Sequence, residues 1–87
     1  MLKQYIRNKK NNPIGVLLAD KIDNDIQLGF SLCSKRDTYN KEKGMQIALH
    51  RLHHKGVLNI PDSINELVDA FELRAAKYFK IAVVQEE

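Results

Sequence analysis

The chain has 87 residues and a mass of 10.0 kDa, which leaves room for one domain only. Hydrophobic residues make up 44% and charged residues 29%, a balance that excludes a disordered chain, and no apolar run approaches the ~18 residues of a membrane span. The net charge of +3 is uneven, because residues 1–55 carry +6 and residues 56–87 carry −3. This asymmetry indicates an anionic ligand or head-to-tail pairing of copies, and an accidental bias of a solvated surface explains it as well.

The first third of the chain has the pattern of three strands. Residues 2–7 form a short first strand, and the polar residues 8–12 are typical of a turn. The nearly continuous apolar run 14–19 predicts a strand that is covered on both faces and stands in the middle of the sheet. Asp-Asn-Asp at 23–25 favours a tight hairpin turn. Apolar residues then alternate with small or polar ones over 26–33, which predicts an apolar side turned inward and a small, polar side turned outward.

Two helices are predicted after the strands, over residues 40–55 and 63–82. Asn40 is the expected N-cap of the first helix, and Gly56 is its expected C-terminal stop. Its apolar face is expected to consist of Met45, Ala48, Leu49 and Leu52. Ser63-Ile64-Asn65-Glu66 has the pattern of a capping box for the second helix. The apolar face of that helix is expected to consist of Ile64, Leu67, Val68, Phe71, Ala75, Tyr78, Phe79 and Ala82.

These elements predict a single α+β domain over residues 1–87. A three-stranded antiparallel β-meander within residues 1–33 is followed by two α-helices that cover it. The apolar tail at residues 81–84 extends beyond a single helical stripe, so it either frays or packs against another copy of the chain.

Few residues suggest catalysis or metal binding. Zinc needs about four ligands, but Cys33 is the single thiol, and a surface cluster of histidines explains His50, His53 and His54 as well, with His50 and His54 as i, i+4 neighbours on a helix flank. Nothing near Cys33 supplies the orienting group of a cysteine nucleophile. The aspartates around the hairpin turn lack the spacing of a calcium loop. The glycines form no nucleotide-binding fingerprint, and no pair of carboxylates suggests acid–base chemistry. We therefore expect a protein that is not an enzyme and needs no cofactor or metal.

The densest polar stretch is residues 31–41, which join the last strand to the first helix. Hydroxyl groups and the backbone amides of a helix N-terminus can hold an anion at such a joint. Lysine and arginine side chains there add positive charge, and Tyr39 offers a surface for stacking a base. A solvated loop with a capping aspartate accounts for the same residues. Arg7 and Arg74 can reach this joint only if the fold or a partner brings them there.

The segment Gly29-Phe30-Ser31-Leu32-Cys33-Ser34-Lys35-Arg36-Asp37-Thr38-Tyr39, followed by Lys41-x-x-Gly44, Ala48 and Arg51, resembles a family of small tailed-phage proteins. The flanks agree with this family in a basic first strand, in Pro-Ile-Gly-Val at 13–16 and in Lys-Tyr-Phe at 77–79. Phe30 stands where tryptophan is more frequent in the family, and Tyr39 where phenylalanine is. The family resemblance implies an oligomeric anti-CBASS-type sponge, with relatives that act on Thoeris signals. Such a sponge binds a cyclic nucleotide immune messenger without cleaving it.

The expected function is therefore sequestration of a cyclic nucleotide by a homo-oligomer, a tetramer or dimer. The residues expected to bind this ligand are Ser31, Lys35, Arg36, Asp37, Tyr39 and Arg51. The two arginines and Lys35 would contact phosphate, Tyr39 would stack on a base, and Ser31 and Asp37 would donate or accept hydrogen bonds. A small nucleic-acid-binding accessory protein that uses the same basic segment is the first alternative. A protein inhibitor of a host enzyme that uses the apolar tail is the second.

The expected location is the cytoplasm of the host bacterium, with no membrane partner. The N-terminal segment MLKQYIRNKK lacks the apolar stretch of a signal peptide. The single cysteine, Cys33, cannot form an intramolecular disulfide, which agrees with a reducing compartment.

Overall fold

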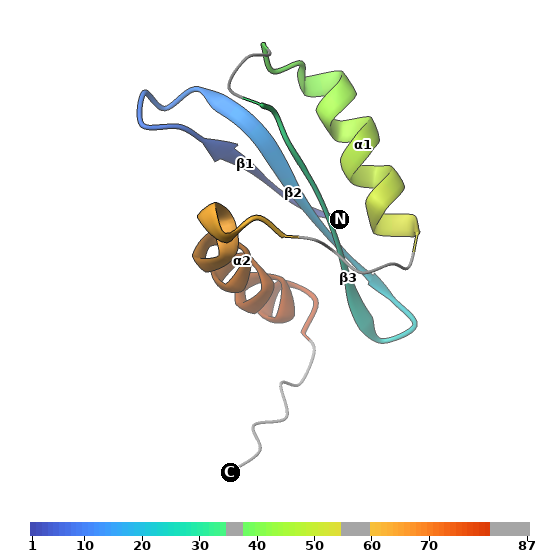
Figure 1. Ribbon diagram of the computed structural model, residues 1–87. Coiled ribbons are helices and arrows are strands. Elements are labelled where there is room, and N and C mark those ends of the chain that lie inside the picture. The colour runs from blue at the N-terminus through green and yellow to red at the C-terminus, as the bar shows by residue number, and fades with distance from the viewer. Residues whose placement is uncertain (35–37, 55–59, 81–87) are drawn as a thin grey trace.

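The computed structural model describes residues 1–34, 38–54 and 60–80. An antiparallel sheet in the order β1-β2-β3 comes first, built from β1 (Leu2–Arg7), β2 (Pro13–Ile22) and β3 (Asp25–Leu32). The α-helix α1 (Lys41–His53), the 3-10 turn η1 (Asp62–Ile64) and the α-helix α2 (Asn65–Tyr78) follow. The predicted α+β architecture, a three-stranded meander followed by two helices, is confirmed (Figure 1).

Asparagine and aspartate residues build both turns of the meander. The side-chain oxygen of Asn8 accepts hydrogen bonds from two backbone amides of the first turn, at 2.9 and 3.0 Å, and Asn11 has a φ of 65°. The second turn consists of Asp23 and Asn24, with φ angles of 51° and 69°. Two consecutive left-handed residues are the mark of a type I′ hairpin turn, whose twist matches that of the strands. The predicted hairpin is therefore confirmed.

The middle strand is buried on both faces because one helix covers each face of the sheet (Figure 1). Val16 and Leu18 pack in the core beneath α1. Leu17 and Ala19 point the other way and pack in a separate core on the α2 side. All four side chains are almost fully buried, so the continuous apolar run of this strand reflects its position between two layers.

The side of β3 that carries Gly29 and Ser31 does not face outward, and that prediction is wrong. Both residues are buried beneath α1. A Cβ atom added at Gly29 would lie 2.2 Å from the backbone oxygen of Ala48 and 2.8 Å from the Cβ of Leu52. The small residues of β3 therefore provide a flat surface that the backbone of α1 approaches closely. Their pattern is one of helix packing rather than of solvation.

Helix α1 begins where the sequence predicts. The Asn40 side chain accepts a hydrogen bond from the backbone amide of Lys43 at 3.1 Å, which confirms it as the N-cap. The helix ends at His53, two residues before the predicted end, and Gly56 lies outside the described residues. Its apolar face is confirmed: Ala48 and Leu52 are buried, and Met45 and Leu49 pack partly buried beside them.

Helix α2 is shorter than predicted, and the capping box is wrong. Ser63 lies inside the 3-10 turn, and Ile64 is the N-cap residue, without a side-chain cap bond. The amide of Ile64 instead donates to the backbone oxygen of Pro61 at 3.1 Å. Ser63 and Ile64, which the capping box predicts at the start of the α-helix, therefore belong to the 3-10 turn that follows the proline.

The inner face of α2 matches most of its prediction. Ile64, Val68, Phe71 and Ala75 are buried, and Leu67 and Phe79 pack against them. Tyr78 does not belong to this face, because 58% of its surface is exposed at the end of the helix. Ala82 and the apolar tail at residues 81–84 lie outside the described residues.

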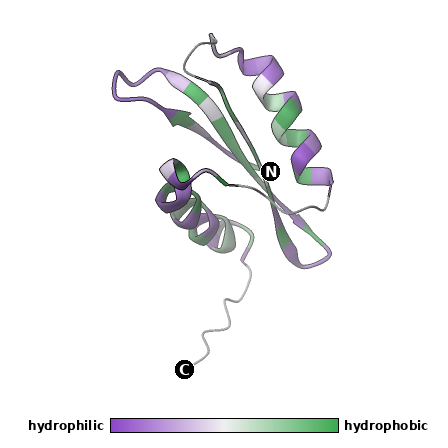
Figure 2. Cartoon of the chain, in the orientation of Figure 1, coloured by the Kyte–Doolittle hydropathy of each residue, from purple (hydrophilic) through white to green (hydrophobic). Residues whose placement is uncertain are grey.

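The hydropathy of the chain follows this layering. In Figure 2 the turn between β1 and β2 is hydrophilic, whereas the helices carry both hydrophilic and hydrophobic stretches. Within residues 1–34, 38–54 and 60–80, no helix is long and apolar enough to cross a membrane.

Candidate ligand-binding groove

An open groove lies where β3 ends and α1 begins, at the joint that the sequence singles out. Its volume of about 520 Å³ lies within the range of small-molecule sites. Its walls are polar and apolar in equal part and come from the end of β3, the joint and the first two turns of α1. The residues that line it are Ser31, Leu32, Cys33, Ser34, Thr38, Tyr39, Asn40, Lys43, Gly44 and Ile47.

Two of the predicted site residues, Ser31 and Tyr39, meet in this groove. Ser31 is only 4% exposed, and its hydroxyl has no hydrogen-bond partner among the described residues. The Tyr39 hydroxyl is also buried and likewise has no hydrogen-bond partner within the described part of the chain. Burial raises the pKa of Tyr39, and the nearby Ser31 hydroxyl opposes this effect only in part. A buried hydroxyl without a partner is costly, so a ligand that bonds to this pair gains affinity from it.

The hydroxyl edge of the Tyr39 ring is turned toward the first turn of α1. A Cβ atom added at Gly44 would lie 2.5 Å from the Tyr39 oxygen and 2.6 Å from the ring carbon Cε1. Glycine at this position therefore lets the tyrosine pack against the helix backbone. Stacking of a base on the Tyr39 ring stays a prediction. A ligand cannot reach the edge of the ring that packs against Gly44.

The groove opens onto the positive end of α1. The backbone amides of the first helical turn lie on this side, and Lys43 of the same turn lines the groove. Asn40 already bonds one of these amides, that of Lys43 itself. Lys35, Arg36 and Asp37 lie outside the described residues, so their roles stay predictions.

The structure does not bring the predicted Arg51 into the groove. Its Nη1 donates to the backbone oxygen of Phe30 at 3.0 Å, and its guanidinium carbon lies 4.9 Å from the centre of the Phe30 ring. β3 is an edge strand, so Arg51 bonds a carbonyl at the border of the sheet. Arg7 and Arg74 are also engaged elsewhere, with the backbone oxygen of Asn11 and the side chain of Gln4.

Tyr5, which the sequence did not single out, lies in the same row of the sheet as Ser31 because of the strand register. Tyr5 pairs with Val16, and Val16 pairs with Ser31, so the three lie side by side on the α1 face. The Nζ atoms of Lys3 and Lys41 lie 5.3 and 5.1 Å from the centre of the Tyr5 ring. Only the pairing of β1 with β2 brings these residues near the groove, and no local motif marks it.

The histidines lie on the outer surface at the end of α1. The rings of His50 and His54 stack with their centres 3.8 Å apart, and Nδ1 of His54 lies 2.7 Å from the backbone oxygen of His50. No group of three or more metal-binding side chains gathers within residues 1–34, 38–54 and 60–80.

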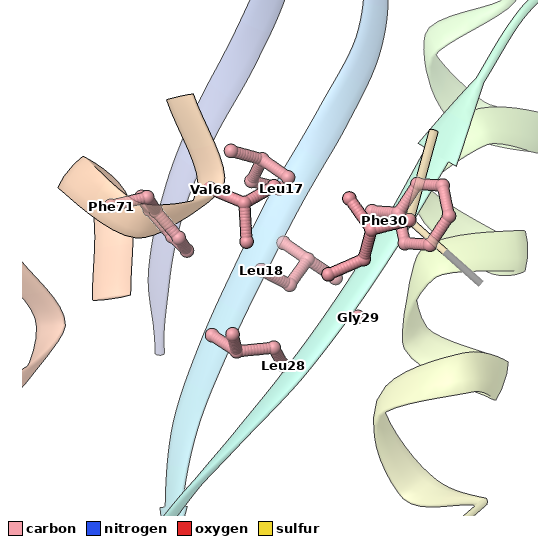
Figure 3. Close-up of a pocket in the computed structure, with 8 residues that line it drawn as sticks. Leu17, Leu18, Leu28, Gly29, Phe30, Val68 and Phe71 are labelled. Carbon is pink, nitrogen blue, oxygen red and sulfur yellow. The ribbon is translucent and has the colours of Figure 1, made fainter. Parts of the chain in front are cut away.

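A second, much smaller space lies between α2 and the sheet (Figure 3). Phe71 and Val68 of α2 face Leu17 of β2 across it. Its volume of about 10 Å³ has room for one water molecule at most, and its walls are apolar. It is a packing gap of the core rather than a ligand site.

Comparison with known proteins leaves the function open. No protein-family model matches the chain, and no curated protein and no solved structure matches it either. The resemblance to the phage sponge family therefore stays a prediction, and the groove itself has to support any functional proposal.

Proposed function

We propose that this protein is a phage-encoded sponge. It binds a cyclic nucleotide immune messenger in the groove between β3 and α1 and holds it without cleaving it, in the cytoplasm of the host bacterium. The observation that carries the proposal is the buried hydroxyl of Ser31 beside that of Tyr39, in a groove at the N-terminus of α1, with no hydrogen-bond partner in the part of the chain that the structure describes. The proposed ligand contains phosphate groups that can accept a hydrogen bond at this point.

The walls of the groove match the parts of a nucleotide. The ammonium group of Lys43 and the positive end of α1 favour a phosphate group. Leu32 and the half-exposed Ile47 provide apolar surface for a base or the carbon face of a ribose. Thr38 also lines the groove, and its hydroxyl can bond sugar or base oxygens.

Sequestration requires affinity and abundance rather than catalysis. A messenger that is bound tightly by a protein in excess over it cannot reach its effector, by mass action alone. Binding also stabilises the protein, because the ligand binds the folded chain and not the unfolded one. For a domain of 87 residues, whose intrinsic stability is small, this gain is readily measurable.

The test incubates the purified protein with a panel of cyclic mononucleotides and cyclic dinucleotides, and measures binding by calorimetry. The bound fraction is then released by heat and identified by mass spectrometry. We expect at least one member of the panel to be captured and released unchanged. Release of a cleaved product, or no capture at millimolar ligand, contradicts the proposal.

Variants assign the capture to the groove. Ser31→Ala and Lys43→Met are each expected to weaken binding by about tenfold, the effect of one lost hydrogen bond to a charged group. Lys21→Met is the matched control, because Lys21 is an exposed lysine near the opposite end of β2. Equal affinities for all four proteins would place the site elsewhere.

A further inference from the structure

We infer that His50 and His54 form a binding site for one divalent transition-metal ion, of the class that imidazole nitrogens prefer: Ni²⁺, Cu²⁺ or Zn²⁺. The two side chains supply two ligands, and water completes the coordination of the ion. This site is independent of the proposed function, because it lies near the opposite end of α1 from the groove. The helix rises about 14 Å between Lys41 and His50.

The hydrogen bonds of His54 leave one of its ring nitrogens free to bind an ion. His54 is the C-cap residue of α1, and its backbone amide donates to the backbone oxygen of His50 at 3.1 Å. Its Nδ1 lies 2.7 Å from the same oxygen. A carbonyl oxygen can only accept, so Nδ1 carries the proton of the neutral ring and Nε2 keeps its lone pair. A ring N–H that donates to a backbone carbonyl is the usual arrangement of a histidine that ligates a metal.

The two imidazole rings lie close enough to share one ion. His50 and His54 are one helical turn apart, so their side chains leave the same side of α1. Their rings stack with centres 3.8 Å apart and planes inclined by 26°. Two nitrogens that bind one tetrahedral ion at the usual bond length lie about 3.3 Å apart. Because both residues are exposed, each ring is free to make the small rotation that this separation requires.

The surroundings of the pair favour a cation. The end of α1 carries the negative end of the helix dipole. Among the described residues, neither ring forms an ion pair or a hydrogen bond other than that of His54 Nδ1. Arg51 belongs to the same turn, but its guanidinium group is bonded to the backbone oxygen of Phe30. His53 joins no group of three metal-binding side chains within the described part of the chain, so the pair alone forms the site.

An ion bound to both rings ties the last turn of α1 to its C-cap residue. Leu52 lies between the two histidines in the sequence and is buried in the core beneath the helix. The ion therefore fastens the end of α1 that packs against the sheet. Two imidazoles fall short of the four ligands of a closed structural zinc site, so the ion exchanges with solvent and the chain folds without it.

The experiment titrates the full chain with NiCl₂ by calorimetry, with MgCl₂ as the comparison because Mg²⁺ prefers oxygen ligands. We expect one Ni²⁺ ion per chain and no binding of Mg²⁺. Saturating Ni²⁺ should also raise Tm by about 5 °C or more, because the ion binds the folded chain more tightly than the unfolded one. Equal binding of the two ions, or an unchanged Tm, overturns the inference.

Variants assign the ion to the pair. His50→Ala and His54→Ala should each weaken Ni²⁺ binding by at least about tenfold, the cost of disturbing the outer shell of a metal alone. His53→Ala is the matched control, because His53 is an exposed histidine of the same turn, and it should bind Ni²⁺ like the wild type. Wild-type affinity in either variant of the pair, or an equal loss in His53→Ala, refutes the site. Thermal unfolding without metal shows that each variant is folded.

Discussion

Gly29 lies where the backbone of α1 comes closest to the sheet, and the Gly29→Ala variant measures how much this approach contributes to stability. The added Cβ would lie 2.2 Å from the oxygen of Ala48 and 2.8 Å from the backbone nitrogen of Leu52. Ordinary contact starts more than 1 Å farther out, so α1 has to move by about that distance. Overpacking of this kind costs about 1–3 kcal/mol, and the upper end applies because the obstacles are backbone atoms.

An opposing effect is smaller. Alanine restricts the unfolded chain more than glycine does, which stabilises the folded state by about 0.4–1 kcal/mol. The net loss for Gly29→Ala is then about 2 kcal/mol, a large part of the total stability of about 4–13 kcal/mol expected for a domain of this size. Because α1 forms one wall of the groove, the same shift should also weaken ligand capture.

Urea unfolding followed by circular dichroism provides the measurement. A loss of 2 kcal/mol corresponds to a fall in Tm of about 8–16 °C for a small domain. Gln27→Ala is the control, because Gln27 lies two residues earlier on the same strand and the same face. If Gly29→Ala unfolds at the same urea concentration as Gln27→Ala, α1 does not approach the sheet as closely as described.

Two further predictions concern the start of α1. Asn40→Ala removes the side-chain oxygen that accepts from the Lys43 amide, so it should lower the free energy of unfolding, measured with urea, by about 1 kcal/mol. Asn40→Ser keeps a capping oxygen and should lose much less. Equal losses for the two variants would contradict the capping role. Burial raises the pKa of Tyr39 in the folded state. The neutral Tyr39 side chain therefore contributes to the free energy of unfolding below the ordinary tyrosine pKa near 10, and this contribution is lost as the pH rises through the raised pKa of the folded state. Wild-type stability should therefore fall more steeply above pH 10 than that of Tyr39→Phe, and parallel curves would refute this.

Local patterns were sufficient to predict the strands, both turns and the N-cap of α1. Each of these depends on nearby residues: the β2 run on its continuous apolar residues, the β3 run on alternation, the second turn on Asp23 and Asn24, and the cap on Asn40. The capping box failed because Pro61 favours a 3-10 turn, which uses Ser63 before the α-helix begins. Competition between two local signals cannot be settled without the tertiary packing of Ile64.

The candidate site was predicted only in part, for a different reason. The joint between β3 and α1 is contiguous in the sequence, so Ser31 and Tyr39 could be found together there. The association of Tyr5 with Ser31 depends instead on the register of three strands. The position of Arg51 depends on which face of the sheet α1 covers, and period-2 alternation does not determine that.

The fold and the groove share one cause in the small and polar side of β3. Gly29 allows α1 to lie flat on the sheet, and two residues later Ser31 presents a hydroxyl that no side chain of the described residues bonds. Beyond Leu32 the strand ends, and the chain leaves the sheet before it returns as α1. The helix therefore covers the strand at Gly29, and the groove begins beside the buried Ser31, where the strand is about to end. A buried hydroxyl without a partner among the described residues is costly, so the Ser31 side chain is the point of this joint that gains most from a polar ligand.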